Sequence, residues 1–405
     1  MRDRLGKTVF PLLLVGYVLF AMFRTVGGVV LPAISGEFAL SDVEAGLLIS
    51  AAMLSTAVAM GLVGYISSIA GRGRSLVLGY LLLTLGMGLT GFAPNYFICL
   101  LLFATASFGA GVFVSTLYAL VGEIFPRSRG LLLGVTNSFF AVGGFLGPWL
   151  AGNILELYSW REVFQLLGVA AAPVLVTLLL VLRSRYPQTS HRDLGVKASY
   201  MKALRNRSIT LICLMMATAN LAFITFLSWT PTFLLRIQGL QVSQAGLLVG
   251  FVSVFGAAGA IVFGLLSDRT KKWLMNAVTG ISSGACSLIL FNGVYTFDVL
   301  VVLTAVFGFT CFAYWNLIIA SAQDSVGHEE IVLVTGLVTN SGTIGAIFGP
   351  LIAGLLTPAV GLGKALVACV TIPLLLYGFS SSTKSWLPEH PRPKTQAKKS
   401  SSPTT

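Results

Sequence analysis

The sequence predicts an all-α membrane protein with twelve transmembrane helices, arranged as two parallel, pseudo-symmetric six-helix bundles. Of its 405 residues, 56% are hydrophobic and only 10% are charged, whereas soluble domains average about 25% charged residues. Apolar runs of about 20 residues, each long enough to cross the hydrocarbon layer as a helix, recur throughout, and the second half of the chain repeats the first. This composition excludes a soluble enzyme, a nucleic-acid-binding module and a disordered chain.

The apolar runs define twelve spans in chain order. The expected spans cover residues 9–34, 41–64, 75–93, 96–123, 130–155, 163–182, 208–236, 243–266, 273–293, 299–322, 331–357 and 363–383. The expected domains are an N-terminal six-helix bundle (1–182), a cytoplasmic linker (183–207), a C-terminal six-helix bundle (208–387) and a disordered cytoplasmic tail (388–405). The tail consists largely of Pro, Lys and Ser and has almost nothing to bury.

The net charge of +12 is a topology signal rather than a sign of nucleic-acid binding. With these spans, alternate loops lie on opposite sides of the membrane, and 22 of the 26 basic residues fall on one side. The other side holds Arg161, Arg236 and Lys364, and Arg24 lies inside a span. Cytoplasmic loops carry an excess of Lys and Arg, so we expect both termini in the cytoplasm and the protein in the cell membrane.

The second half repeats the first at offsets of 199 to 202 residues. An even number of spans in each half makes the halves parallel repeats, related by an axis along the membrane normal. The matches are Ala45-Gly46-Leu47-Leu48 with Ala245-Gly246-Leu247-Leu248, Gly64 with Gly264, Pro173 with Pro373, Pro32 with Pro231, Glu123 with Asp324, and Gly143-x-x-x-Gly147-Pro148 with Gly345-x-x-x-Gly349-Pro350.

Small residues at i and i+4 let helices approach closely in lipid. We therefore expect Gly143 and Gly147 in the fifth span, and Gly345 and Gly349 in the eleventh, to pack against neighbouring helices. Pro148 and Pro350, which follow these glycines, should add a bend. The same glycines could serve either as ordinary packing positions or as sliding surfaces during a conformational change.

The repeat and several local patterns resemble the major facilitator superfamily across residues 8–385. The loop after the second span runs from Gly64 to Arg72-Gly73-Arg74, and its counterpart runs from Gly264 through Asp268-Arg269. The glycine-proline signature of the fifth span, Glu123 before Phe125-Pro126, and Trp160-Arg161 before Phe164 are also similar to the family. The resemblance implies a secondary transporter that alternates between inward-open and outward-open states, with spans 1, 4, 7 and 10 lining the central path.

One departure from the family pattern concerns the cytoplasmic gate. Ser68 stands where the family usually has an Asp, which helps hold the cytoplasmic side shut, partly by facing a helix N-terminus. Closure should therefore depend on Arg72 with Glu123, and on Asp268 and Arg269 with Asp324. These charges could instead serve only to solvate the loops. The expected gating residues are Gly64, Arg72, Glu123, Gly264, Asp268, Arg269 and Asp324.

Arg24 is the residue most indicative of function. It lies about 24 Å of helical rise from the start of its span and about 15 Å from the other end, too deep to reach water by extending its side chain. An arginine at the bilayer centre costs about 2.5–3.5 kcal/mol on insertion scales, so it should face the bundle interior or a wet cavity. It either bonds backbone carbonyls at a helix break near Gly27-Gly28 or binds an anionic substrate through its planar fork of donors.

In the superfamily, an arginine at this depth of the first span resembles the organic-anion and organophosphate branch, which often has a second arginine in the seventh span. The equivalent position here is Ile224, which favours a singly charged group such as a carboxylate over a phosphate. Other polar and aromatic residues on the lining spans either complete the site or merely pack. The expected substrate-binding residues are Arg24, Tyr17, Asn220, Thr225, Tyr314, Trp315 and Asn316.

The leading interpretation is therefore a transporter that moves a small organic anion, most simply a carboxylate, by exchange or proton symport. Its expected partners are the substrate, a co-transported proton or an exchanged anion, and the lipid bilayer, and we expect a monomer. The main alternative is a drug or multidrug efflux antiporter of the same superfamily, although a cationic drug would meet Arg24 with no balancing acid.

An enzymatic role or a channel finds little support in the sequence. Membrane enzymes need clustered His, Asp or Glu within the spans, and this chain offers no such cluster in its expected spans. A channel is disfavoured because the repeat yields one central path without a ring of identical groups. The five cysteines lack C-x-x-C spacing and should be small core residues, and neither a cofactor nor a metal ion is expected.

Overall fold

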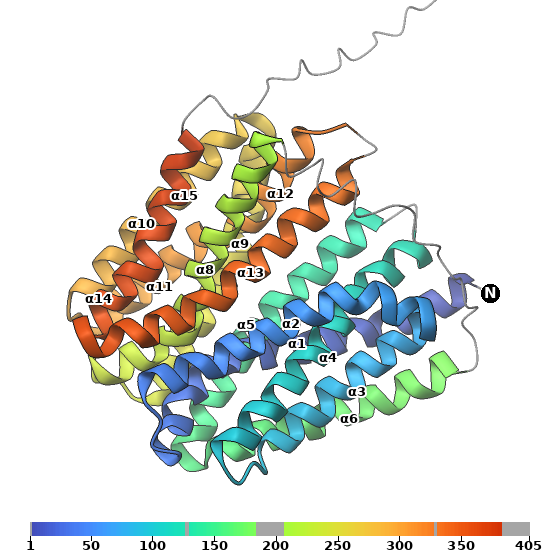
Figure 1. The fold of residues 1–405 in the computed structure, drawn as a ribbon, viewed down its shortest axis with the longest axis horizontal. Coiled ribbons are helices and arrows are strands. Elements are labelled where there is room, and N and C mark those ends of the chain that lie inside the picture. Colours follow the sequence, from blue (N-terminus) through green and yellow to red (C-terminus); the bar gives the residue numbers. More distant parts are fainter. Residues whose placement is uncertain (1, 126–128, 184–205, 328–329, 383–405) are drawn as a thin grey trace, which may run out of the picture.

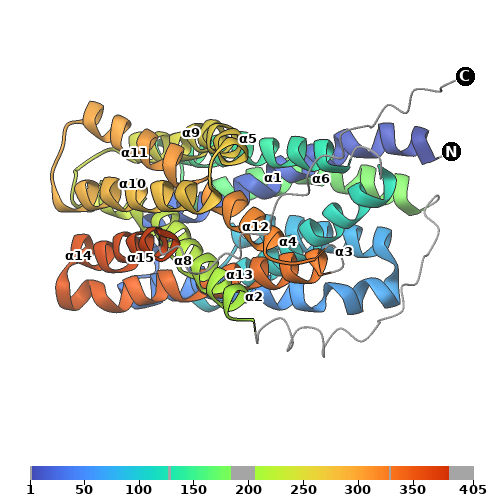
Figure 2. The same ribbon diagram turned by 90° about the horizontal axis from the view of Figure 1, so that it is seen from above.

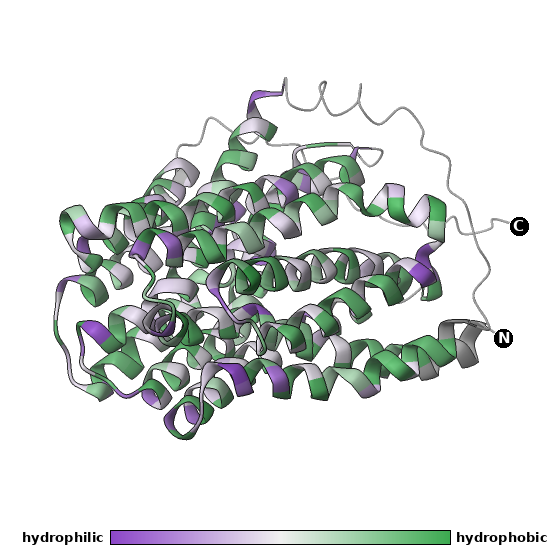
Figure 3. Ribbon diagram, turned by 60° about the horizontal axis from the view of Figure 1, so that its bottom comes forward, coloured by the Kyte–Doolittle hydropathy of each residue, from purple (hydrophilic) through white to green (hydrophobic). Residues whose placement is uncertain are grey.

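The computed structural model describes residues 2–125, 129–183, 206–327 and 330–382. Within them lie twelve helical spans that are long and apolar enough to cross a membrane, and they match the spans predicted from the sequence. Large apolar side chains are exposed, such as Leu180 at 71% and Val169 at 70%, and hydrophobic residues predominate along the helices (Figure 3). These surfaces require a lipid environment. The predicted linker, apart from its end residues, and the predicted tail lie outside the described residues.

The first half consists of six helices. They are α1 (Arg2–Glu37), α2 (Asp42–Ala70), α3 (Arg72–Thr90), α4 (Tyr96–Ile124), α5 (Arg129–Leu157) and α6 (Trp160–Arg183). The second half has the same six spans, two of them divided. It contains α8 (Arg207–Arg236), α9 (Val242–Arg269), α10 (Lys272–Asn292), α11 (Phe297–Cys311), α12 (Tyr314–Asp324), α13 (Ile331–Val360), α14 (Leu362–Leu366), the π-helical turn η1 (Val367–Thr371) and α15 (Ile372–Ser382).

The sequence repeat is visible in how the helices begin. At the start of α2, the Ser41 backbone N–H donates to Glu44 Oε2 at 2.8 Å, and the Glu44 N–H donates back to Ser41 Oγ at 3.3 Å. At the start of α9, two hundred residues later, the Gln241 N–H donates to Gln244 Oε1 at 3.1 Å. Such reciprocal bonds satisfy N–H groups that have no partner within the helix. Equivalent spans therefore begin with equivalent caps.

Each half packs into its own bundle, and the bundles meet along two outer helix pairs and, beside them, where α1 contacts α8. Helix α3 packs on α6 and α1 on α5 in the first bundle, as α10 packs on α15 and α8 on α13 in the second. Between the bundles, α5 contacts α9 and α2 contacts α13. Figure 2 shows these two pairs on opposite sides of the molecule. The predicted fold class is confirmed, and the two interfaces are related by the pseudo-symmetry of the chain.

The predicted helix-packing glycines lie at close backbone contacts. A β-carbon at Gly143 would overlap the carbonyl oxygen of Val18 on α1, and one at Gly147 would lie 2.8 Å from Met22 Cα. In the second bundle, Gly345 meets the backbone of Ala217 on α8 in the same way. Gly349 is equally close to α8, where a β-carbon would collide with a threonine hydroxyl. Helix α5 therefore packs closely on α1, and α13 packs on α8 at the equivalent positions of the repeat.

The prolines after these glycines lie at the interface between the bundles. The carbonyl oxygen of Pro148 would collide with a β-carbon at Gly246 of α9, and that of Pro350 would lie 2.5 Å from one at Gly46 of α2. Trp229 of α8 also donates its indole N–H to the Pro350 oxygen at 3.1 Å. Both prolines lie inside continuous helices.

The bundles touch at one end and separate toward the other (Figure 1). We call the end where α1 begins the basic end and the other the opposite end. Gly64 and Gly264 lie 18 residues, or five helical turns, beyond Gly46 and Gly246, and so on the same faces of α2 and α9. A β-carbon at either Gly64 or Gly264 would meet no atom within 4 Å. The described structure is therefore closed at the opposite end and open at the basic end.

Two irregularities of the second bundle were not predicted. The tenth span is broken at Phe312 and Ala313, between α11 and α12. A β-carbon at Gly259 of α9 would collide with the Phe309 carbonyl just before this break. The twelfth span contains the π-helical turn η1, and such turns often occur at functional positions. Neither feature has a counterpart in the first bundle.

The opposite end of α1 is held by α6. Arg161 Nη2 donates to Glu37 Oε1 at 2.6 Å, and Trp160 Nε1 donates to Glu37 Oε2 at 2.6 Å. Arg161 also donates to the carbonyl oxygen of Ala93 at 2.7 Å, and its guanidinium lies 4.7 Å from the Trp160 ring centroid. The cluster fixes the end of α1 against two other segments of its bundle.

Candidate functional site

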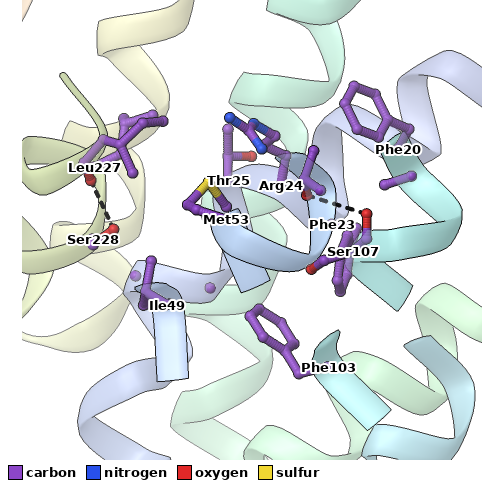
Figure 4. A pocket seen from close by; sticks show the side chains of 15 residues that line it. Phe20, Phe23, Arg24, Thr25, Ile49, Met53, Phe103, Ser107, Leu227 and Ser228 are labelled. Carbon is purple, nitrogen blue, oxygen red and sulfur yellow. Dashed lines mark hydrogen bonds between the residues drawn. The ribbon is translucent and has the colours of Figure 1, made fainter. Parts of the chain in front are cut away.

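A pocket lies between the two bundles at the depth of Arg24 (Figure 4). Its lining comes from α1, α2 and α4 of the first bundle and from α8 of the second. The lining residues are Phe20, Phe23, Arg24, Thr25, Gly27, Gly28, Ile49, Met53, Thr56, Phe103, Ser107, Ala110, Ile224, Leu227 and Ser228. Arg24 is the only ionisable residue among them.

Helix α1 passes Arg24 without a break. It is continuous from Arg2 to Glu37, so the predicted break near Gly27-Gly28 is absent. Within the described residues, the guanidinium makes neither a hydrogen bond nor an ion pair, and its interactions are electrostatic ones with the hydroxyls of Tyr17 and Tyr314. The alternative in which backbone carbonyls occupy Arg24 is therefore wrong for this structure. The donor fork of the arginine is available in the pocket.

Tyr17 is the first member of a hydrogen-bonded chain in the first bundle. Its hydroxyl lies 2.7 Å from that of Tyr118 on α4, and the Tyr118 hydroxyl donates to Asn137 Oδ1 on α5 at 2.8 Å. Because the Tyr118 proton is used on Asn137, the bond between the tyrosines requires Tyr17 to donate to Tyr118. Tyr17 therefore has only lone pairs left to offer Arg24.

Tyr314 has the same arrangement in the second bundle. It begins α12, directly after the break in the tenth span, and its hydroxyl donates to Asn220 Oδ1 at 2.7 Å. The Asn220 amide in turn donates to the Gly342 carbonyl oxygen on α13 at 2.7 Å, which fixes the amide orientation. The Tyr314 proton is thus directed away from Arg24. Two tyrosines, one from each bundle, thus interact electrostatically with Arg24 without a hydrogen bond to it.

The predicted binding residues other than Arg24, including Tyr17, Asn220 and Tyr314, lie outside the pocket lining. Thr225 donates to the Leu221 carbonyl at 2.7 Å and packs against Gly349. Trp315 is half-buried beside Gly342. Asn316 is exposed on α12. Helix α8 contributes Ile224, Leu227 and Ser228 to the lining, and the sequence analysis proposed none of them as a binding residue. The 200-residue repeat marks them, since they correspond to Arg24, Gly27 and Gly28.

The predicted ion pair of the first bundle is present. Arg72, at the start of α3, pairs with Glu123, near the end of α4. The prediction for the second bundle was wrong in its cation, because Lys272 Nζ lies 2.5 Å from Asp324 Oδ2. The repeat could have identified this lysine, since Lys272 lies 200 residues after Arg72. Both pairs join helices of one bundle and do not cross between bundles.

Asp268 and Arg269 do not join this pair. Both side chains are exposed at the end of α9, and neither forms an ion pair with another described residue. Gly64 and Gly264, by contrast, lie on helix faces that meet the other bundle at the closed end. In the described structure, Gly64 and Gly264 therefore lie where the two bundles are apart. The acidic residues Glu123 and Asp324 lie near the end of α4 and at the end of α12.

Ionic and polar contacts between the bundles occur at the closed end. Arg236, the last residue of α8, donates to Asp42 Oδ1 at 2.7 Å, at the start of α2. Ser243 near the start of α9 donates to Glu156 near the end of α5. These contacts cross between the bundles, from α8 to α2 and from α9 to α5, and they were not predicted from the sequence. Across the described ranges, no group of three or more His, Cys, Asp or Glu side chains is placed to hold a metal ion.

Comparison with known families agrees with this architecture. The model of the Major Facilitator Superfamily matches residues 13–350 and 239–403, which together include nearly all of the described helices. The chain belongs to the major facilitator superfamily. It is thus a secondary transporter with twelve membrane-spanning helices, and its family is not typically enzymatic.

The relatives in this family include carriers of different anions. The chain is 27% identical over 390 residues to a gallate transporter of Pseudomonas putida, covering 86% of this chain and 85% of that one. It is 23% identical over 384 residues to a hexuronate transporter of Bacillus subtilis, covering 89% of each. It is 26% identical over 313 residues to the glucose-6-phosphate exchanger SLC37A2 of Danio rerio. That match covers 64% of this chain and 63%, less than two thirds, of the exchanger.

Solved structures share the fold. A crystal structure of a D-xylose-proton symporter superposes with a TM-score of 0.76 at 15% identity, over 94% of this chain and 98% of that chain. A bacterial homolog of the human lysosomal transporter Spinster, in an inward-facing and unoccupied conformation, superposes with a TM-score of 0.75 at 17% identity. It covers 93% of this chain and 95% of that chain. At these identities the likeness establishes the fold alone.

Proposed function

We propose that this transporter moves a small organic anion, most simply a carboxylate, by alternating access, with Arg24 as the group that binds the anion. The observation that carries the proposal is that Arg24 lies in the pocket with its hydrogen-bond donors unused by the described residues. It is the only ionisable residue in the lining of the pocket between the bundles, and its donors have no hydrogen-bond acceptor within the described residues.

The electrostatics of the pocket favour an anionic ligand. A guanidinium in the membrane interior is costly unless it is solvated or paired, and tyrosine hydroxyl oxygens supply only partial negative charge. A bound carboxylate would neutralise the cation and accept two parallel hydrogen bonds from it. The names of the relatives agree with this proposal, since gallate, hexuronate and glucose 6-phosphate are all anions.

The positive-inside rule orients the protein. The basic end carries Arg72, Arg74, Lys271 and Lys272, so on this proposal it faces the cytoplasm in the cell membrane and the described state is inward-open. The opposite end, closed by the Arg236–Asp42 pair, then faces outward. Alternating access requires that these closures break while the faces at Gly64 and Gly264 come together.

We propose that the energy for transport comes through the substrate itself, by exchange of anions or by a proton that travels with the anion. No carboxylate lines the pocket, so the protein offers no acidic group there to carry a proton. Exchange of one anion for another, or symport in which the proton travels with the anion, requires no such group. One copy of the chain supplies both walls of the pocket, which is consistent with a monomer.

Efflux of cationic drugs is not favoured. A lipophilic cation in this pocket would meet Arg24 without an acidic residue in the lining to offset the repulsion. Reconstitution into liposomes separates the two functions. We expect uptake of carboxylates above the level of protein-free liposomes and no transport of a lipophilic cation such as tetraphenylphosphonium. Cation transport without anion transport would overturn the proposal.

The gate at the basic end gives a further testable expectation. Ser68 lies four residues beyond Gly64 on α2 and is exposed, and α13, which packs on α2, begins at this same end. A carboxylate near a helix N-terminus is stabilised by about 0.3–1 kcal/mol. We therefore expect Ser68→Asp to shift the population about two- to fivefold toward the state closed at the basic end.

Thiol labelling of Gly264→Cys measures this shift, because a β-carbon at Gly264 lies in open space and the five native cysteines are buried. In the Ser68→Asp background the labelling rate from the basic end should fall. Ser68→Asn, which has the same shape without the charge, is the control. Equal labelling rates in the aspartate and asparagine variants would contradict an electrostatic gate.

A further inference from the structure

The first bundle lines the pocket with a charged side chain, and the second bundle lines it with an apolar one at the equivalent position of the repeat. Arg24 on α1 and Ile224 on α8 occupy equivalent positions of the two halves, and both line the same pocket. A symmetric site would carry two cations facing one ligand. This one carries a guanidinium on one bundle and an alkyl side chain on the other, so it can compensate a single negative charge.

The rest of the lining is mainly apolar. Helix α8 contributes Ile224 and Leu227, which are each 6% exposed. The first bundle contributes three aromatic rings and two long aliphatic side chains, which Figure 4 shows around the pocket. These are Phe20, Phe23, Phe103, Ile49 and Met53. Such walls bind the apolar part of a ligand by removing it from water.

The hydroxyl groups in the lining have already used their protons. Thr25 donates to the Ala21 carbonyl at 2.9 Å. Ser228 donates to that of Ile224 at 2.7 Å. Thr56 donates to a carbonyl on its own helix at 3.0 Å and to one on α4 at 3.1 Å. Apart from Arg24 and Ser107, the lining side chains therefore have few donors to offer.

This arrangement disfavours heavily hydroxylated ligands. A sugar acid carries hydroxyl groups that need donors and acceptors in several directions, and polar groups buried without partners are costly. A phosphate monoester carries nearly two negative charges at neutral pH and would find one cation. Among the described side chains, the pocket thus matches one singly charged head and an apolar body.

We propose, on the basis of the anion-transport function above, that the substrate is a monocarboxylate with an apolar body, aromatic or branched. Its carboxylate binds Arg24 on α1, and its body packs against Ile224 and Leu227 on α8. The ligand then bridges the bundles through two kinds of contact, ionic on one side and apolar on the other. Polyhydroxylated sugar acids and sugar phosphates are excluded as good substrates.

Calorimetric titration of the detergent-solubilised protein tests the class of ligand without passive leakage of acids across a bilayer. The four probes are benzoate, acetate, glucuronate and glucose 6-phosphate. We expect benzoate to bind at least about tenfold more tightly than each of the other three, because only benzoate buries an apolar ring in addition to its carboxylate. Glucuronate or glucose 6-phosphate binding more tightly than benzoate would overturn the proposed class.

A variant of the apolar wall locates the body of the ligand. Ile224→Ala should weaken benzoate binding about five- to tenfold, because it removes alkyl contact area, and should leave acetate within about twofold, because acetate has no body to contact that wall. Ile224→Val serves as the conservative control and should have a smaller effect. Equal weakening of benzoate and acetate would contradict the placement on α8.

Different results would overturn the anion-transport function and the proposed substrate class. If Arg24→Ala abolishes binding of glucuronate, and glucuronate binds best, the proposed apolar body of the substrate is wrong while the anion-transport function stands. If no anion binds, or if Arg24→Ala leaves benzoate binding unchanged, the proposed function itself is overturned.

Discussion

We expect Arg24→Ala to reduce the initial rate of anion uptake into liposomes by about a hundredfold or more. Removing one partner of a desolvated charge pair costs about 3–5 kcal/mol, and each 1.4 kcal/mol corresponds to about a tenfold change in affinity. Alanine would leave the substrate carboxylate without a cation in the pocket lining, where Arg24 is the only ionisable side chain. Uptake of a labelled carboxylate, corrected for protein-free liposomes, measures the loss.

Arg24→Lys is the matched control, since it keeps the charge and loses the planar fork. We expect the lysine variant to retain part of the activity, between wild type and Arg24→Ala, if the carboxylate is held by two parallel hydrogen bonds. Equal uptake by wild type and Arg24→Lys would exclude bidentate binding. Full activity of Arg24→Ala, with equal amounts of folded protein, would exclude Arg24 as the anion site.

The second large effect is expected at Gly28, where the bundles touch most closely beside the pocket. A β-carbon there would collide with the Leu227 carbonyl oxygen on α8 and lie 3.0 Å from Ser228 Cα. Both are backbone atoms and have little freedom to move aside. Because overpacking costs about 1–3 kcal/mol, we expect Gly28→Val to disfavour closure of the opposite end and to lower uptake about tenfold or more.

The control for Gly28 lies on the same helix. A β-carbon at Gly36 would meet no atom within 4 Å, so Gly36→Val should leave uptake near the wild-type level. The melting temperature of both variants shows whether they fold. If Gly28→Val transports as fast as Gly36→Val, close contact between α1 and α8 is not needed for the transport cycle.

The fold could be predicted almost completely from the sequence, because lipid imposes strong and local constraints. An apolar run of the right length has to be a helix with all its backbone groups bonded internally. The repeat of Gly143 and Gly147 at Gly345 and Gly349 also indicated which helices approach closely. The structure agrees, with α5 against α1 and α13 against α8.

The site could be predicted only in part. Arg24 was singled out because a cation is conspicuous inside an apolar span, and it lines the pocket. Tyr17 and Tyr314 were singled out as polar aromatic residues on the lining spans, and they lie outside the pocket lining. The break before α12 was missed because nothing marks Phe312 and Ala313 locally, and the break depends on how α11 packs against glycines of α9. The equivalence of Ile224 to Arg24 indicated that a second cation is missing. It did not indicate that Ile224 and Leu227 line the pocket, because both resemble ordinary core residues.

The closures of the opposite end also escaped sequence reasoning. Arg236 and Asp42 lie 194 residues apart, and neither stands out among other residues at span ends. Their pairing depends on how the bundles dock, which follows from contacts of small residues such as Gly46 and Gly246. Interactions between repeats require the packing geometry, whereas interactions within a span need only the local pattern.

The central claim is that an anion occupies the donors of Arg24 between the two bundles. A structure of the protein with its best-transported anion bound tests this claim most directly. The account predicts the anionic group within about 3 Å of the guanidinium nitrogens, with the rest of the ligand toward α8. A transported anion bound elsewhere in the molecule, with the Arg24 donors still free of it, would contradict the account.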